Sequence, residues 1–257
     1  MIRAAFFDID GTLLSFKTHE VSIGTIQAFD ELHRKGIRTF ISSGRPKILI
    51  PEMPLTFDGY VTMNGGYCFV DDKVLVRNPI PQEETDRWLR FAMEKNLSTM
   101  IFTEDEMYVN RTDDPVANGI RDELGFTMPP LMDTEGMLGR EAYQLIAIMP
   151  ASEDARVQAL LPHCRLPRWH PQFSDIVHRD NSKAVGIEAI LSHFNIDRSE
   201  AIAFGDGGND IEMLEYCGIG VAMGNAAPEV KAHADYVTES VDNEGILRAI
   251  RELRIEN

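Results

Sequence analysis

The stretch FFDIDGT, residues 6–12, places two carboxylates one residue apart at the end of an apolar run. Side chains alternate between two faces of an extended segment, so Asp8 and Asp10 are expected to project to the same side. Gly11 then permits a sharp turn in which backbone N–H groups face an anion. The stretch predicts a strand that enters the core and carries two acidic groups at its carboxyl end.

These two carboxylates suit a specific chemistry. A carboxylate at a strand end can attack phosphorus and form an aspartyl phosphate, and a second carboxyl can then exchange protons with the leaving group and with water. The alternative for an isolated D-x-D-G-T is a strand that ends in an ordinary Asp-Gly turn. The choice depends on what other segments bring to the same place.

Composition limits the possible partners. The chain has 257 residues, 44% of them hydrophobic and 26% charged, which is typical of a globular protein. No apolar run approaches the roughly 18 residues of a membrane helix, so we expect no membrane partner. The formal net charge of −16 argues against a nucleic-acid partner, because phosphate backbones are bound through excess Lys and Arg.

The N-terminus and the cysteines indicate a cytoplasmic location. MIRAAFFDIDGT lacks the basic region, long apolar run and cleavage site of a secretory signal. The three cysteines, Cys68, Cys164 and Cys217, are odd in number and widely spaced, which favours reduced buried thiols over a disulfide framework.

Apolar runs alternate with amphipathic stretches, the pattern of an α/β fold with a mostly parallel sheet. We expect strands at residues 4–9 and 201–205 and helices at residues 22–34, 182–194 and 210–216. Residues 81–180 carry their own alternation between proline-bearing borders, NPIPQ and LPRWHP. Residues 1–80 and 181–257 are therefore expected to form a core into which residues 81–180 insert an α/β module.

Two further stretches end predicted strands in polar residues. FISSGR, residues 40–45, ends in two hydroxyls, a glycine and Arg45. A hydroxyl and a free N–H at a strand end can hold a phosphoryl oxygen, although Ser-Gly is also a common turn pair. AFGDGGNDIEML, residues 203–214, brings Asp206 to a strand end and Asn209 and Asp210 to a helix start. Mg²⁺ prefers such oxygen ligands, while Asp210 could also cap its helix.

RDNSKAVGIEAIL, residues 179–191, places Lys183 in the first turn of a predicted helix. Helix N-termini favour anions, so this position is electrostatically unfavourable for a lysine unless it has a function. An ammonium beside Asp8 would offset the charge of the nucleophile and stabilise an incoming phosphate. A solvated surface lysine is the alternative.

Together these stretches resemble the haloacid dehalogenase superfamily of phosphohydrolases. The matching motifs are D-x-D-G-T at residues 8–12, a hydroxyl before glycine at 43–44, the lysine at 183 and G-D-x-x-N-D at 205–210. The insertion resembles the larger, C2-type α/β cap of the Cof-type subgroup, whose members commonly hydrolyse sugar phosphates. MNGG at 63–66 and AMGNAAPEVK at 222–231 are similar to other stretches typical of that subgroup. The resemblance implies a doubly wound, Rossmann-like core sheet.

The resemblance also implies roles for individual residues. Asp8 would attack phosphorus, and Asp10 would protonate the leaving oxygen and then activate water. Mg²⁺ would be bound by the Asp8 carboxylate, the Asp10 carbonyl and Asp206, with Asp210 in an outer shell. The groups expected to hold the phosphoryl group are Gly11, Ser43, the Gly44 N–H, Lys183 and Asn209, with Arg45 as an accessory group.

The chain departs from the family pattern in three places. Ser43 stands where threonine is frequent, Asp175 where Glu is more usual and Ala184 where Gly is more usual.

The spacing of Asp8 and Asp10 also predicts their protonation. Two like charges close together raise one pKa, so we expect a protonated Asp10 while Mg²⁺ and Lys183 keep Asp8 ionised.

The expected function is a Mg²⁺-dependent phosphatase, a phosphoric monoester hydrolase acting on a small phosphorylated metabolite such as a sugar phosphate. One alternative is a phosphomutase, which would use the same aspartyl phosphate. Another is a signalling receiver domain, but in such a domain Asp10 and the insertion would have no purpose.

The histidines and tryptophans are not expected to form the site. His163, His170 and His178 lack a compact metal-ligand spacing, and Trp88 and Trp169 are expected to pack within the insertion.

Overall fold

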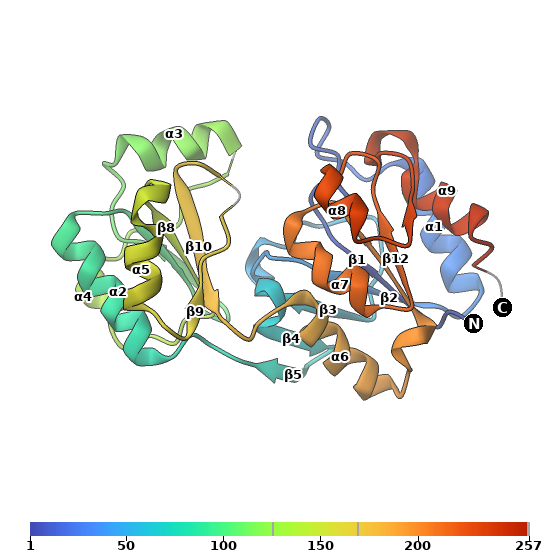
Figure 1. Ribbon diagram of the computed structural model, residues 1–257, viewed down its shortest axis with the longest axis horizontal. Coiled ribbons are helices and arrows are strands. Elements are labelled where there is room, and N and C mark those ends of the chain that lie inside the picture. The colour runs from blue at the N-terminus through green and yellow to red at the C-terminus, as the bar shows by residue number, and fades with distance from the viewer. Residues whose placement is uncertain (125, 169, 256–257) are drawn as a thin grey trace. The chain divides into compact units, whose positions relative to one another are not determined.

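The computed structural model describes residues 1–124, 126–168 and 170–255 and divides into two compact units (Figure 1). The core unit contains Met1–Arg45, Leu49–Arg77 and the chain from Ser182 onward. The inserted unit contains Asn78–Asn181 together with Pro46–Ile48. The role of the inserted unit as a cap stays a prediction.

The core unit is built on an eight-stranded sheet. In spatial order its strands are β13 (Tyr236–Val237), β12 (Ile219–Ala222), β11 (Ala201–Gly205), β1 (Ala4–Phe7), β2 (Arg38–Ser42), β3 (Gly59–Thr62), β4 (Tyr67–Val70) and β5 (Lys73–Arg77). The strands from β13 to β3 are parallel, and β4 and β5 extend the sheet as antiparallel strands. The chain leaves β1 toward β2 and later returns to its other side as β11, so the strand order changes direction at β1, where such sheets bind ligands.

Helices cover both faces of this sheet. They are α1 (Ile23–Arg34), α6 (Lys183–Phe194), α7 (Ile211–Tyr216), α8 (Pro228–Ala232) and α9 (Gly245–Glu252). Phe6 belongs to an apolar cluster with residues of α6 and α7, whereas Phe7 packs with residues of α1 and α9, which lie side by side (Figure 1). Burial of alternate β1 side chains on opposite faces confirms the predicted doubly wound α/β fold.

The predicted helix starts are confirmed by their caps. Ser22 accepts a hydrogen bond from the Thr25 N–H at the start of α1, and Ser182 accepts one from the Val185 N–H at the start of α6.

The predicted strand at residues 4–9 is two residues too long. The Ile9 carbonyl accepts hydrogen bonds from the N–H groups of Leu13 and Leu14, so the chain turns directly after β1. The alternation argument for Asp8 and Asp10 therefore does not apply, because neither residue lies in the strand.

The inserted unit has a second sheet, which is antiparallel. Its strands, in spatial order, are β7 (Met107–Val109), β6 (Thr99–Phe102), β8 (Gln144–Ile148), β10 (Phe173–His178) and β9 (Cys164–Arg165). Its helices are α2 (Gln82–Lys95), α3 (Pro115–Leu124), α4 (Thr134–Met137) and α5 (Asp154–Leu160). Trp88 of α2 is fully buried and donates to Thr99 Oγ1 at 2.8 Å, so it packs in this unit as expected. Trp169 lies outside the described residues.

The two ends of the inserted unit are hydrogen bonded to each other. Asn78 Nδ2 donates to Asn181 Oδ1 at 2.7 Å, and Asn181 Nδ2 donates to the Asn78 carbonyl at 3.0 Å. The residues where the chain enters and leaves this unit therefore form one polar pair.

The three cysteines are buried and free, as the sequence predicts, and burial raises the thiol pKa of Cys68 and of Cys217 to about 12. Among the described helices, none is long and apolar enough to cross a membrane.

Candidate active site

Acidic side chains meet where β1 and β11 end and α7 begins. Asp8 follows β1, Asp206 follows β11, and Asp210 directly precedes α7. Each of the three contributes a carboxylate oxygen to a group in which these oxygens all lie within 4.8 Å of one another. Three segments distant in sequence thus build one acidic cluster in the core unit.

Lys183, the first residue of α6, lies inside this cluster. Its Nζ lies 2.6 Å from Asp8 Oδ1 and 2.5 Å from Asp210 Oδ1, and the lysine is fully buried. Burial alone lowers the pKa of Lys183, but Asp210 and Asp8 outweigh this effect and leave it above its ordinary value. The ammonium is therefore charged, and the alternative of a solvated surface lysine is wrong.

Asp210 stabilises the turn after β11 by accepting hydrogen bonds from its backbone. Its Oδ2 accepts hydrogen bonds from the N–H groups of Asp206 at 2.9 Å and Gly207 at 2.8 Å, while Oδ1 accepts from Lys183. The Asp210 side chain makes no capping bond to the described N–H groups of α7. Its carboxylate holds the Asp206 backbone in place instead of capping the helix that follows.

Asp206 receives one side-chain hydrogen bond on each of its oxygens. Thr12 Oγ1 donates to Oδ1 at 3.3 Å, and Asn225 Nδ2 donates to Oδ2 at 3.0 Å. Asn225 Nδ2 also donates to the Gly11 carbonyl at 2.9 Å, and Asn225 Oδ1 accepts from the Val241 N–H. Sequence reasoning assigned no role to Asn225, although it lies in the AMGNAAPEVK stretch.

Gly11 is required by the position of Asp206. Its φ is +83°, and a Cβ at this position would lie 2.2 Å from Asp206 Oδ2. A larger residue here would displace the carboxylate as well as strain the turn.

The cluster holds more negative than positive charge. Burial, together with the Asp210 carboxylate, raises the pKa of Asp8 to about 8 and that of Asp206 to about 7. Lys183 opposes this effect in both cases. The sequence argument expected the raised pKa on Asp10, whereas in the structure it is Asp8 that is buried among carboxylates.

Asp10 pairs with Arg45. Arg45 Nε donates to Asp10 Oδ2 and Arg45 Nη2 donates to Asp10 Oδ1, each at 2.7 Å. These hydrogen bonds raise the pKa of Arg45. Arg45, expected as an accessory group near the phosphate or the substrate, contacts the second carboxylate. The protonation expected of Asp10 stays a prediction.

The remaining predicted residues lie around the turn after β2. Ser43 is buried and its Oγ accepts from the Arg45 N–H at 3.1 Å. Asn209 Nδ2 donates to Asn64 Oδ1 at 3.0 Å, and a Cβ on Gly44 would lie 3.2 Å from Asn64 Nδ2. Asn64 is the second residue that sequence reasoning left without a role, and its signal was the MNGG stretch.

The acidic cluster fits a divalent cation. It offers several carboxylate oxygens, the ligands that Mg²⁺ prefers, and one ammonium does not balance three carboxylates. Among residues 1–124, 126–168 and 170–255 it is the one group of three or more acidic, histidine or cysteine side chains so arranged. Of the histidines, His163 pairs its Nδ1 with Glu84 at 2.6 Å in the inserted unit.

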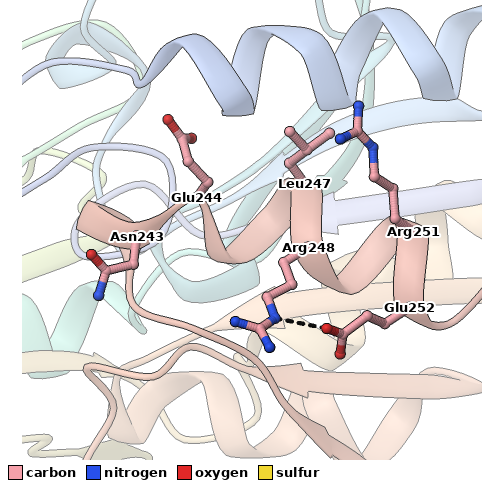
Figure 2. Close-up of a pocket in the computed structure, with 6 residues that line it drawn as sticks. All are labelled: Asn243, Glu244, Leu247, Arg248, Arg251 and Glu252. Carbon is pink, nitrogen blue, oxygen red and sulfur yellow. Dashed lines mark hydrogen bonds and ion pairs between the residues drawn. The ribbon is translucent and has the colours of Figure 1, made fainter.

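A depression on the surface of α9 has no part in this cluster (Figure 2). It is lined by Asn243, Glu244, Leu247, Arg248, Arg251 and Glu252. Arg248 and Glu252 pair with each other at 2.7 Å, and Arg251 pairs with Glu31 of α1. Its charged groups are therefore already engaged within the core unit.

Comparisons with known proteins agree on one family. The model of the haloacid dehalogenase-like hydrolases matches residues 5–250. A protein of Bacillus subtilis (strain 168) named "Putative phosphatase YkrA" is 35% identical, over 98% of this chain and 97% of its own length. The haloacid dehalogenase subclass IIB sugar phosphatase BT4131 is 39% identical with a TM-score of 0.91, over 99% of this chain and 100% of its own. The phosphatase BT1666 from Bacteroides thetaiotaomicron is 35% identical with a TM-score of 0.92, over 100% and 96%.

Proposed function

Because the chain belongs to the haloacid dehalogenase-like hydrolases and is a Cof-type phosphatase, we propose that it hydrolyses a small phosphate ester through an aspartyl phosphate on Asp8. The observation that carries this proposal is the buried contact of Lys183 with Asp8 and Asp210, beside Asp206. A sugar phosphate is the proposed substrate class, supported by the 39% identity with a sugar phosphatase.

In the first half-reaction Asp8 is the nucleophile. Its free carboxylate oxygen forms a bond to phosphorus while the bond from phosphorus to the ester oxygen breaks. The protonated form of Asp10 gives its proton to the departing alkoxide. Since Arg45 now binds both oxygens of Asp10, one of these hydrogen bonds has to open before the carboxyl can carry that proton.

In the second half-reaction Asp10 is a base. Its carboxylate takes a proton from water, the water oxygen bonds to phosphorus, and the bond from phosphorus to Asp8 breaks. Inorganic phosphate leaves and Asp8 is regenerated. The two hydrogen bonds from Arg45 orient the Asp10 carboxyl for this step.

The positive groups compensate the charge of the approaching phosphate. Lys183 neutralises Asp8 and faces the position where charge develops on the phosphoryl oxygens. Asp8, Asp206 and the Asp10 carbonyl would hold Mg²⁺, with Asp210 behind them, and the bound cation would lower the repulsion between carboxylates and phosphate. Ser43, the Gly44 N–H and Asn209 complete the proposed phosphoryl site.

The test is phosphate release from a panel of phosphorylated metabolites by wild type and by Asp8→Asn. The amide preserves the shape of Asp8 but is no nucleophile, so we expect at least a thousandfold loss, on the order seen when a nucleophile is removed. Asp235→Asn is the matched control, since this carboxylate accepts only the Gly220 N–H among the bonds described, away from the cluster. Near-normal turnover by Asp8→Asn would remove the nucleophile from the mechanism.

A further inference from the structure

The MNGG segment adopts an unusual backbone conformation. Three consecutive residues have positive φ: Met63 at 49°, Asn64 at 51° and Gly65 at 87°. Positive φ is uncommon for residues other than glycine, and two such residues in succession persist only where their surroundings impose them. Backbone strain of this kind is concentrated at ligand sites, which directs attention to the Asn64 side chain.

The segment is fixed between two of the predicted phosphoryl-binding elements. The Met63 N–H donates to the Arg45 carbonyl and the Asn64 N–H donates to the Ser43 carbonyl, both at 3.1 Å. On the other side, a Cβ on Gly65 would lie 2.0 Å from the carbonyl oxygen of Ser182, the N-cap of the helix that carries Lys183. The backbone of Asn64 thus lies between the Ser43 turn and the start of α6.

The carboxamide of Asn64 has a defined orientation. The residue is only 4% exposed, and its Oδ1 accepts the hydrogen bond from Asn209 Nδ2 at 3.0 Å. Nδ2 is therefore the donor end, and it lies next to Gly44, where a Cβ would come within 3.2 Å. Among the described residues no acceptor takes a hydrogen bond from this Nδ2. A nearly buried amide donor without a protein acceptor is a group that a ligand can satisfy.

We propose that Asn64 is a phosphate-contacting residue: its Nδ2 donates to a phosphoryl oxygen, while its Oδ1 orients the carboxamide of Asn209. This inference rests on the proposed function and adds a residue to its phosphoryl site. Gly44 has no side chain beside this amide, and a Cβ there would lie 3.2 Å from Nδ2 and 3.3 Å from Oδ1. The hydrogen bonds of the segment to the Arg45 and Ser43 carbonyls fix the backbone, with its positive φ, from which the amide extends.

Two variants distinguish a direct contact of Asn64 with phosphate from a role only in orienting Asn209. Asn64→Asp keeps an oxygen that accepts from Asn209 but replaces the donor with a negative charge. Asn64→Gly removes the whole side chain while glycine adopts the positive φ without strain. Asn195→Gly is the matched control, because Asn195 has φ 52° at the C-terminal end of α6, the end opposite to Lys183.

The measurements are the dissociation constant of inorganic phosphate for the Mg²⁺-loaded protein, kcat/KM for p-nitrophenyl phosphate, and Tm. We expect phosphate to bind about 10-fold more weakly to Asn64→Gly and about 100-fold more weakly to Asn64→Asp, the range of a hydrogen bond to a charged group. Tm reports whether each variant is folded, since in Asn64→Gly the relief of the positive φ and the loss of the bond from Asn209 act in opposite directions. Asn195→Gly should bind phosphate as wild type does.

Phosphate affinity within twofold of wild type in both Asn64 variants, with wild type an active phosphatase, would overturn this inference and leave the proposed function intact. Wild-type affinity in Asn64→Asp alone would also overturn it, because Asn64 would then only support Asn209. A wild-type protein that releases phosphate from no ester would overturn the proposed function and the inference together.

Discussion

Arg45 binds both carboxylate oxygens of Asp10, each at 2.7 Å, so one guanidinium orients the carboxyl to which the proposed mechanism gives both the acid and the base step. The pair is partly exposed, with 36% of the Arg45 side chain and 40% of the Asp10 side chain accessible. Water and substrate can therefore compete for it, so the pair can open during turnover. In the proposed mechanism the closed pair orients Asp10 for the base step, whereas the acid step requires one of the two hydrogen bonds to open.

Replacing Arg45 should therefore change the balance between the half-reactions. In Arg45→Met, Asp10 loses the two hydrogen bonds that orient its carboxyl for the base step. We expect hydrolysis of the aspartyl phosphate to slow about 10-fold, the scale of a charge-assisted hydrogen bond, so that phosphoenzyme accumulates. Acid-quench trapping of labelled protein measures this fraction. Arg45→Lys keeps the charge without the two-point geometry and should lie in between; an unchanged phosphoenzyme fraction in Arg45→Met would contradict the assignment.

Asn225 should control metal affinity through Asp206. In Asn225→Ala the Asp206 carboxylate loses the donor at 3.0 Å and the link to the Gly11 carbonyl, so of its two side-chain donors only the Thr12 hydroxyl, at 3.3 Å, still holds it. We expect Mg²⁺ to bind about 10- to 100-fold more weakly, as measured by calorimetry.

The control for this variant is Asn110→Ala. Asn110 makes similar bonds to the Leu97 carbonyl and the Thr99 N–H, but in the inserted unit. It should lower Tm without changing Mg²⁺ affinity. Equal losses of metal affinity in the two variants would show that Asn225 has no specific effect on Asp206.

The metal-free protein should lose stability as pH rises. The pKa values of Asp8 and Asp206 are about 8 and about 7 in the folded state, above their ordinary value of 3.8. The folded state then holds more protons than the unfolded state between about pH 4 and pH 8. The free energy of unfolding in EDTA should therefore fall across this window, by on the order of a few kcal/mol.

Urea unfolding in EDTA at pH 5.5 and pH 8.5 measures the effect. Saturating Mg²⁺ should reverse it at pH 8.5, because the cation binds the ionised carboxylates. A free energy of unfolding that is flat or rises with pH in EDTA would show that the carboxylates are not buried together.

Lys183→Met should destabilise the fold as well as the reaction. The change leaves Asp8 and Asp210 buried without their shared cation. Loss of one partner of a buried pair costs about 3–5 kcal/mol, and we expect this loss in EDTA at pH 8.5. Mg²⁺ should restore part of it, because a cation can replace the missing charge. Arg3→Met, which breaks the exposed pair with Glu200, is the control and should change stability by less than about 1 kcal/mol.

Much of the fold could be predicted from local patterns. Ser22 and Ser182 precede amphipathic stretches, and Asp206 follows an apolar run, so helix starts and strand ends were readable one segment at a time. The short elements α4 and β9 were not, since four and two residues carry too little periodicity to detect.

The site was less predictable where it depends on pairing across the chain. Nothing local indicates that Arg45 binds Asp10 rather than a ligand, because the partner is 35 residues away. Asn64 acts through a side-chain contact with Asn209, and Asn225 through contacts with Asp206, Gly11 and Val241, and all of these partners are distant in sequence. The protonation expected of Asp10 was inferred from the neighbouring Asp8 alone, without the guanidinium 35 residues away, and it stays a prediction.

The hydrogen bonds between Asn78 and Asn181 hold the two ends of the inserted unit next to each other. Because its two ends are a few ångströms apart, the inserted unit can be shortened, enlarged or exchanged without a change in the distance between the core segments that flank it. The inserted unit, whose role as a cap is a prediction, and the core unit, which carries the proposed reacting groups, can then diversify independently.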